Sequence, residues 1–172
     1  DETAPAGQLT NPPAVVRAFY LTGWSAGSER KINEIIALAK KTGVNGVVID
    51  VKDYSGYVSY AMPVPEVVAA KADQEIRITK PNALLRKLHD NGLYAIARIT
   101  VFQDPLFAAL HPEWALQNKT TGGAWKDHKG IAWMDPAGKG TWDYAVAIAR
   151  DALARGFDEI NFDYIRFASD GA

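Results

Sequence analysis

The chain has 172 residues, of which 48% are hydrophobic and 23% are charged, and this composition is typical of one folded domain. A formal net charge of −1 argues against a nucleic-acid partner, because such proteins carry a basic surplus that neutralises phosphates. The absence of cysteine excludes disulfides, zinc–thiolate sites, iron–sulfur clusters and cysteine nucleophiles, and no apolar run is long enough to span a membrane.

Residues 1–13 form a polar leader that contains prolines and begins without an initiator Met. No signal peptide is visible in it. We therefore expect a processed or trimmed chain, and a secreted or cell-envelope location.

The first half of the chain predicts two strands around one helix. Residues 14–22 predict a buried strand, and residues 45–52 predict a second one. Between them, Ser28 is a candidate N-cap for a helix over 28–41, whose apolar residues recur at helical spacing. Residues 53–60 then predict a small hairpin or an extended loop.

The second half repeats this alternation. A helix is expected from Thr79, a candidate cap, to Asn91, and a strand follows over 93–101. A long aromatic and polar loop over 102–138 leads to a third helix at 140–155 and a fourth strand at 158–167.

Strands that alternate with helices predict a parallel sheet with right-handed crossovers. The loops after the strands are long and those after the helices are short, which is typical of a barrel whose working face lies at the strand C-termini. A complete eight-stranded barrel needs about 250 residues. Residues 14–172 therefore predict either an open doubly wound α/β sheet or the first half of a TIM-type (β/α) barrel. A half barrel exposes sheet edges, so we expect self-association or a further, C-terminal half.

Alternation along the strands predicts which side chains face the barrel interior. In the second strand Val48, Asp50 and Lys52 share the interior face. In the fourth strand the interior side chains are Asn161, Asp163 and Ile165, and the helix-facing ones are Ile160, Phe162 and Tyr164.

Asp50 and Asp163 thus converge near the C-terminal ends of two strands. Two such carboxylates are what cleavage of a glycosidic bond requires, one to protonate the leaving oxygen and one to attack or activate water. Arg98 or Lys52 could pair with one of these acids and keep it ionised. The alternative is a buried salt-bridge network of these four residues that only fixes the barrel.

Aromatic residues gather in the loops after the strands, where they suit either core packing or stacking on sugar rings. They are Trp24, Tyr54, Tyr57, Trp114, Trp125 and Trp133. His111 and His128 lie in the long loop without the tight spacing of metal ligands, so we expect no metal and no cofactor.

Several stretches resemble one family, the putative glycosyl hydrolase domain family of bacterial TIM-barrel proteins. They are GFDEINFDYIRFASDG, WMDPAGKGTWDYAVAIARDALARG, FYLTGWSAGS, NGVVIDVKDYSGYVSY and YAIARITVFQDP. The resemblance implies a glycoside hydrolase-like barrel in which Asp163 is the nucleophile or transition-state stabiliser and Asp50 a second interior acid. Ala168 stands where the family motif usually has Pro. The family domain continues beyond the last motif, so strands five to eight, and any general acid that they carry, are not in this chain.

The first hypothesis is therefore a glycoside hydrolase that acts on a polysaccharide or glycan through Asp163 and Asp50. Its expected substrate-binding residues are Lys52, Arg98, Tyr164, Arg166, Tyr20, Trp24, Tyr54 and Trp133. The alternative is a noncatalytic half barrel that binds glycan or assembles with copies of itself. A third hypothesis is a metal-dependent hydrolase that uses Asp50, Asp53 and His128.

Overall fold

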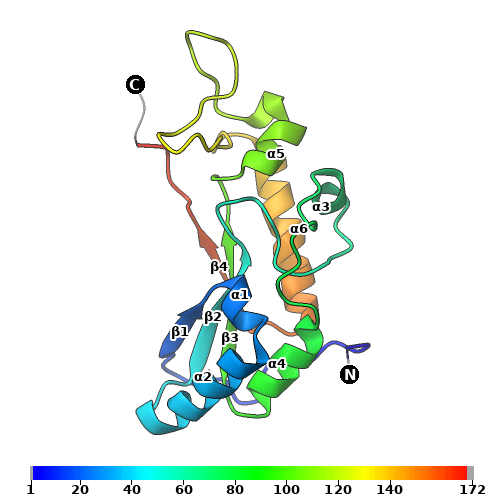
Figure 1. The fold of residues 1–172 in the computed structure, drawn as a ribbon, viewed down its shortest axis with the longest axis vertical. Coiled ribbons are helices and arrows are strands. Elements are labelled where there is room, and N and C mark those ends of the chain that lie inside the picture. The colour runs from blue at the N-terminus through cyan, green and yellow to red at the C-terminus, as the bar shows by residue number, and fades with distance from the viewer. Residues whose placement is uncertain (1, 170–172) are drawn as a thin grey trace.

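Four parallel strands form one sheet in the computed structural model, which describes residues 2–169 (Figure 1). Their order in the sheet follows the chain, β1-β2-β3-β4. The strands are β1 (Ala18–Leu21), β2 (Gly46–Lys52), β3 (Tyr94–Thr100) and β4 (Glu159–Asp163). A doubly wound sheet reverses its strand order at a switch point, and this sheet does not. The open doubly wound alternative is therefore wrong.

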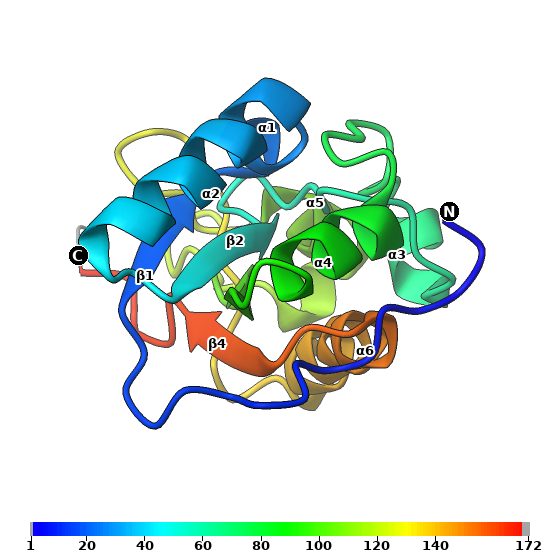
Figure 2. The same ribbon diagram turned by 90° about the horizontal axis from the view of Figure 1, so that it is seen from below.

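Three long helices pack on one side of the curved sheet, as Figure 2 shows. They are α2 (Glu29–Thr42), α4 (Pro81–His89) and α6 (Lys139–Arg155). The apolar side chains of β2 that face them, Val47, Ile49 and Val51, are fully buried, as their alternation predicted. Within residues 2–169, no helix covers the other side of the sheet. Tyr20 of β1, whose hydroxyl reaches Asp50, is 55% exposed.

The ends of the helices show which predicted caps form. Ser28 caps α2, since its hydroxyl accepts a hydrogen bond from the Lys31 backbone N–H at 3.4 Å. The expected cap of α4 by Thr79 is wrong, because Lys80 is the N-cap residue and makes no side-chain cap. The Glu2 carboxylate fills this place, accepting from two backbone N–H groups at the start of α4.

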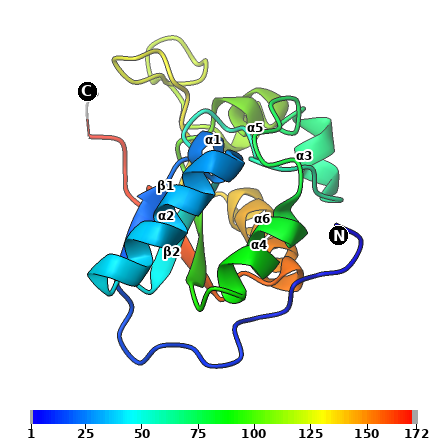
Figure 3. The same ribbon diagram turned by 60° about the horizontal axis from the view of Figure 1, so that its bottom comes forward.

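The polar leader is docked on the domain. Beyond Glu2, the Leu9 backbone N–H donates to Asp158 at 2.6 Å, and the Ala6 N–H donates to the Arg155 carbonyl at 2.8 Å. Figure 3 shows this segment passing below the N-terminal end of the sheet before it enters β1. The leader therefore covers the end of the barrel opposite to the one where loops follow the strands.

The long loop is more structured than predicted. It contains α5 (Pro105–Leu110) and the 3-10 turn η1 (Pro112–Trp114), as well as antiparallel bridges such as the one from Gln103 to Trp133. Asp104 caps α5 by accepting from the Phe107 N–H at 2.8 Å. Two further short helices were not expected, α1 (Gly23–Ala26) and α3 (Pro65–Ala69).

Both outer strands are shorter than predicted. The strand expected over 14–22 is formed only by Ala18–Leu21, and the one expected over 158–167 only by Glu159–Asp163. Within residues 2–169, no helix is long and apolar enough to cross a membrane.

Candidate active site

One arginine joins the two predicted acids at the C-terminal end of the sheet. The register pairs Asp50 with Arg98, and Thr100 with Asp163, so β2, β3 and β4 bring these side chains to one place. Arg98 Nη1 lies 2.6 Å from Asp50 Oδ1. Its Nε and Nη2 each lie 2.7 Å from Asp163 Oδ2. The expected pairing of Arg98 with one acid is confirmed, and the guanidinium binds the second acid as well.

Asp50 is enclosed by its partners. Only 3% of the residue is exposed, and its Oδ2 accepts the Tyr20 hydroxyl at 2.5 Å. Burial, followed by this hydrogen bond and the negative charge of Asp50, raises the pKa of Tyr20 to about 12. The Tyr20 hydroxyl therefore stays protonated at neutral pH and donates to Asp50.

Asp163 has a different environment, because 45% of its side chain is exposed. Its Oδ1 accepts the Tyr164 backbone N–H at 2.6 Å. Partial burial acts to raise the pKa of Asp163, but this N–H and the Arg98 guanidinium outweigh it and hold the pKa below its ordinary value. Asp163 is thus an ionised carboxylate that a ligand can reach.

Tyr164 turns into the site because the strand ends there. Its backbone adopts φ 54°, a left-handed conformation that breaks the alternation of the strand. The ring centre lies 5.8 Å from the Arg98 guanidinium and 5.6 Å from that of Arg166. The predicted helix-side orientation of Tyr164 is therefore wrong, while its expected place beside the acids is observed. Ile165, expected inside, instead lines an apolar groove with Phe162.

Lys52 does not face the site. The register between β2 and β3 shifts between Asp50 and Lys52, and this bulge ends the alternation. The side chain is 1% exposed, and its ammonium lies 2.8 Å from Asp104 Oδ2 and 2.6 Å from the Thr100 carbonyl oxygen. The prediction that Lys52 shares the interior face with Asp50 is wrong, because Lys52 instead ties β2 to the start of α5.

A cleft of about 520 Å³ is lined by Arg98, Asp50 and Tyr164. Asp163 lies beside this cleft, where it contacts Arg98 and the Tyr164 backbone N–H. Trp24 and Tyr54 stand at the wall of the cleft with 59% and 53% of their surface exposed. The Arg77 guanidinium lies 5.5 Å from the Trp24 ring centre and forms an ion pair with Asp53. Arg77 was missed from the sequence, since it lies in a stretch without strand or helix periodicity. It fixes both the aromatic wall and Asp53.

A second pocket of about 230 Å³ adjoins this cleft. It is lined in part by Trp133 and Arg166, whose guanidinium lies 5.1 Å from the Trp133 ring centre. Tyr54 and Tyr164 line both spaces. The predicted binding residues thus divide between two neighbouring spaces, with Tyr20, Trp24 and Arg98 in the cleft, Trp133 and Arg166 in the pocket, and Lys52 in neither.

The residues of the proposed metal hydrolase do not form a metal site. Across residues 2–169, no three histidine or acidic side chains come close enough together to hold a metal ion. Asp53 is instead paired with Arg77, while His128 lines the second pocket.

Comparison with known proteins assigns the family. The model of the putative glycosyl hydrolase domain matches residues 18–172. The chain belongs to this family. A crystal structure of a hypothetical protein from Ruminiclostridium thermocellum is 38% identical, and the match covers 88% of this chain and 78% of that one with a TM-score of 0.83. No curated protein sequence matches significantly.

More distant structures show the fold alone. A chitobiase from Flavobacterium johnsoniae is 13% identical with a TM-score of 0.63, over 88% of this chain and 23% of the enzyme. A maltogenic α-amylase from Thermotoga neapolitana is also 13% identical, with a TM-score of 0.59 over 88% of this chain and 40% of the enzyme. This chain of the glycosyl hydrolase domain family therefore has the predicted α/β architecture, a half barrel of parallel strands.

Proposed function

We propose that this chain carries one half of a glycoside hydrolase site, in which Asp163 is the nucleophile or the base that activates water. The observation that carries the proposal is the state of Asp163, whose side chain is 45% exposed and whose pKa is lowered by the Tyr164 backbone N–H and by Arg98. A carboxylate of this kind suits attack on a sugar carbon or activation of water. Family membership supports glycan as the substrate class.

The two acids have different roles in this proposal. Asp50 is enclosed by Arg98 and Tyr20, so it orients the guanidinium that in turn holds Asp163. Of the two, Asp163 has the more exposed side chain, at 45% against 4% for Asp50. Asp163 is not the general acid, because its lowered pKa leaves it without a proton at neutral pH, and Asp50 is enclosed, so this proposal gives that role to a third group.

The test is hydrolysis of a panel of polysaccharides by the wild type and by Asp163→Asn, each assayed alone and in a chain extended to the complete barrel. The substitution removes the attacking carboxylate and keeps the shape, so the rate should fall by at least about 10³-fold. Glu34→Gln on α2, which changes an exposed acid paired with Arg30 and Lys31, is the matched control and should keep the wild-type rate. Unchanged activity in Asp163→Asn would refute the assignment.

A second candidate function is a noncatalytic glycan-binding module that assembles with a second copy of itself. It is favoured by an apolar groove of about 470 Å³ along α6 and β4, lined by Trp142, Val146 and Phe162 among others. Parallel sheets are normally buried on both faces, and here β1 and β4 are both edges of one sheet. Two copies related by a twofold axis would pair each β4 with the partner's β1 and close an eight-stranded barrel.

Light scattering at several protein concentrations tests this assembly. A dimer that Val146→Glu converts to monomer, together with glycan binding without turnover, would favour the module. A monodisperse monomer at all concentrations would contradict assembly through the open edges.

A further inference from the structure

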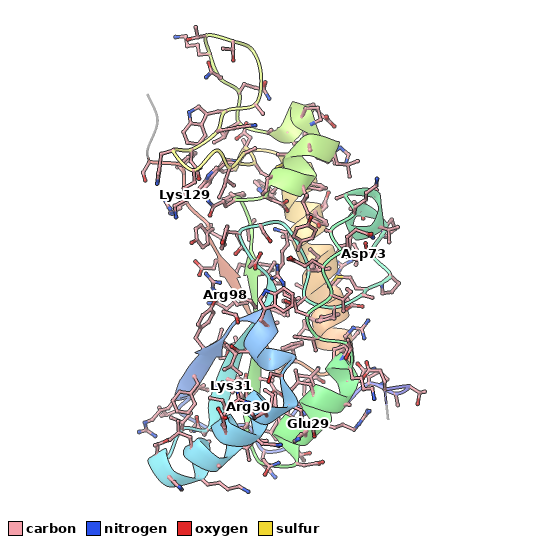
Figure 4. The ribbon with its side chains drawn as sticks, viewed as in Figure 1. Glu29, Arg30, Lys31, Asp73, Arg98 and Lys129 are labelled. Carbon is pink, nitrogen blue, oxygen red and sulfur yellow. The ribbon has the colours of Figure 1, made fainter. Side chains whose placement is uncertain are left out.

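The cleft and the second pocket differ in the sign of their charged side chains. The cleft over Arg98 is lined by three carboxylates, Asp50, Asp53 and Glu75, against the two arginines Arg77 and Arg98, and the Asp163 carboxylate is bound to Arg98 beside it. The second pocket has the opposite balance, with Lys129 and Arg166 against the single carboxylate of Asp127. Figure 4 shows Lys129 and Arg98 on the side of the sheet away from the helices. A ligand that spans both spaces therefore meets acids at one end and cations at the other.

The carboxylate of Asp127 accepts hydrogen bonds from four groups that surround the second pocket. Its Oδ1 accepts the backbone N–H groups of Lys129 and Ile131, each at 2.9 Å. Its Oδ2 accepts the Gln103 amide at 3.1 Å and the Trp133 indole N–H at 3.0 Å. Asp127 is only 8% exposed, so four donors surround its charge and little of it faces a ligand. This arrangement fixes the turn that presents Lys129 at the rim.

Arg166 forms the opposite wall with its charge facing outward. Its guanidinium lies 5.1 Å from the ring centre of Trp133 and 5.6 Å from that of Tyr164. Its Nη1 donates to the Ser169 hydroxyl at 3.2 Å. Stacking on rings orients a guanidinium while leaving its edge able to bind an anion through two parallel hydrogen bonds. Arg166 is exposed, so an anion can reach that edge from solvent.

We propose that the second pocket binds an anionic sugar next to the sugar that reacts at Asp163, so that the substrate is an acidic glycan. Lys129 and Arg166 bind a carboxylate or a sulfate on that sugar, and Tyr164 supports its ring, while the buried Trp133 holds the Arg166 guanidinium in place. Tyr164 lies between the guanidinium groups of Arg98 and Arg166, so it marks the boundary between the two sugar positions. The proposal rests on the glycan-hydrolysing function proposed above and adds the charge of the substrate.

Calorimetric titration with matched pairs of oligosaccharides tests the charge preference. One pair is oligogalacturonate and its methyl ester, and the other is a carrageenan oligosaccharide and its desulfated form. The protein should bind one acidic member at least about tenfold more tightly than its neutral partner, and added salt should weaken this preference. Preference within the first pair identifies a carboxylate, and preference within the second a sulfate.

Two variants locate the preference. Arg166→Gln and Lys129→Gln should each weaken binding of the acidic glycan by about tenfold and leave the neutral one unchanged. Arg30→Gln removes a guanidinium that is 81% exposed on α2, and should bind like the wild type. Equal binding within both pairs, or acidic binding that neither variant weakens, overturns the proposal.

Asp163→Asn separates this proposal from the function on which it rests. The variant should lose hydrolysis and keep the preference for the acidic glycan, because Asp163 does not line the second pocket. Hydrolysis that persists in Asp163→Asn refutes the catalytic role and does not alter the measured preference. Loss of hydrolysis without any preference for charge leaves the catalytic role standing and refutes the acidic substrate.

Discussion

Replacing Arg98 with Met tests whether one guanidinium holds the two candidate acids together. The side chains of Arg98 and Asp50 are 17% and 4% exposed, and removing one partner of a buried ion pair costs about 3–5 kcal/mol. The Asp163 side chain is 45% exposed, so water screens its ion pair with Arg98. This pair therefore contributes at most about 1 kcal/mol to the free energy of unfolding. Because Arg98 is not fully buried, we expect a total loss near the lower end, about 3 kcal/mol at pH 7.

The loss of stability in Arg98→Met should become smaller as the pH falls. In the wild type the folded state lowers the pKa of Asp163, so its contribution to stability is present above the unfolded value of about 3.9 and is lost as pH falls. In Arg98→Met the carboxylates of Asp50 and Asp163 have no cation beside them, and protonation removes their uncompensated negative charge. The difference in stability between the variant and the wild type should therefore shrink as the pH falls from 7 toward 4.

Urea unfolding followed by tryptophan fluorescence measures this deficit at pH 7 and pH 4.5. Arg30→Met, at a position with an 81% exposed side chain, is the matched control and should change stability by less than about 0.5 kcal/mol. A deficit of the same size at both pH values, or one no larger than that of the control, would refute the reasoning.

Three further substitutions test side chains that hold the domain together. Lys52→Met leaves a buried carboxylate without its cation and should lower the free energy of unfolding by about 3–5 kcal/mol in urea titrations. Gly140→Ala would place a Cβ 2.2 Å from the Trp114 ring, so Tm should fall and the near-UV circular dichroism of tryptophan should change. Burial opposes ionisation of Asp158, but the His89 ring and two backbone N–H groups lower its pKa, so its contribution to stability is lost as pH falls. Asp158→Asn should therefore lower Tm more at pH 7 than at pH 3.5, and the reverse order would contradict this.

Strand alternation predicted the interior face wherever the ladder is regular, and it failed at the strand ends. Asp50 and Asp163 face the same site, as expected from their positions. Lys52 does not follow the alternation because a bulge precedes it, and Tyr164 does not follow it because its φ is 54°. Neither a bulge nor a left-handed residue other than glycine has a clear local signal in one sequence, because contacts with distant segments stabilise it.

The second pocket could not be predicted for a related reason. Apart from Tyr54, its residues come from the long loop and from the segment after β4, and Asp127 and Gln103 hold that loop against the end of the sheet. The sequence identified Trp133 and Arg166 as single candidates. The stacking of Arg166 on Trp133, which holds the guanidinium charge at the pocket, depends on the tertiary fold.

The position of protons in the site indicates where the general acid lies. Asp163 is ionised, and the proton of Tyr20 is committed to Asp50 because its pKa is about 12. Asp163 therefore has no proton to give and the Tyr20 hydroxyl keeps its own, so neither group protonates a leaving oxygen at neutral pH. In a barrel the catalytic residues come from the C-terminal ends of several strands, and four such ends line this half. In the proposed mechanism the proton donor is then a further group, either Asp53 or Glu75, which line the same cleft and pair with Arg77, or a residue of whatever closes the sheet between β4 and β1.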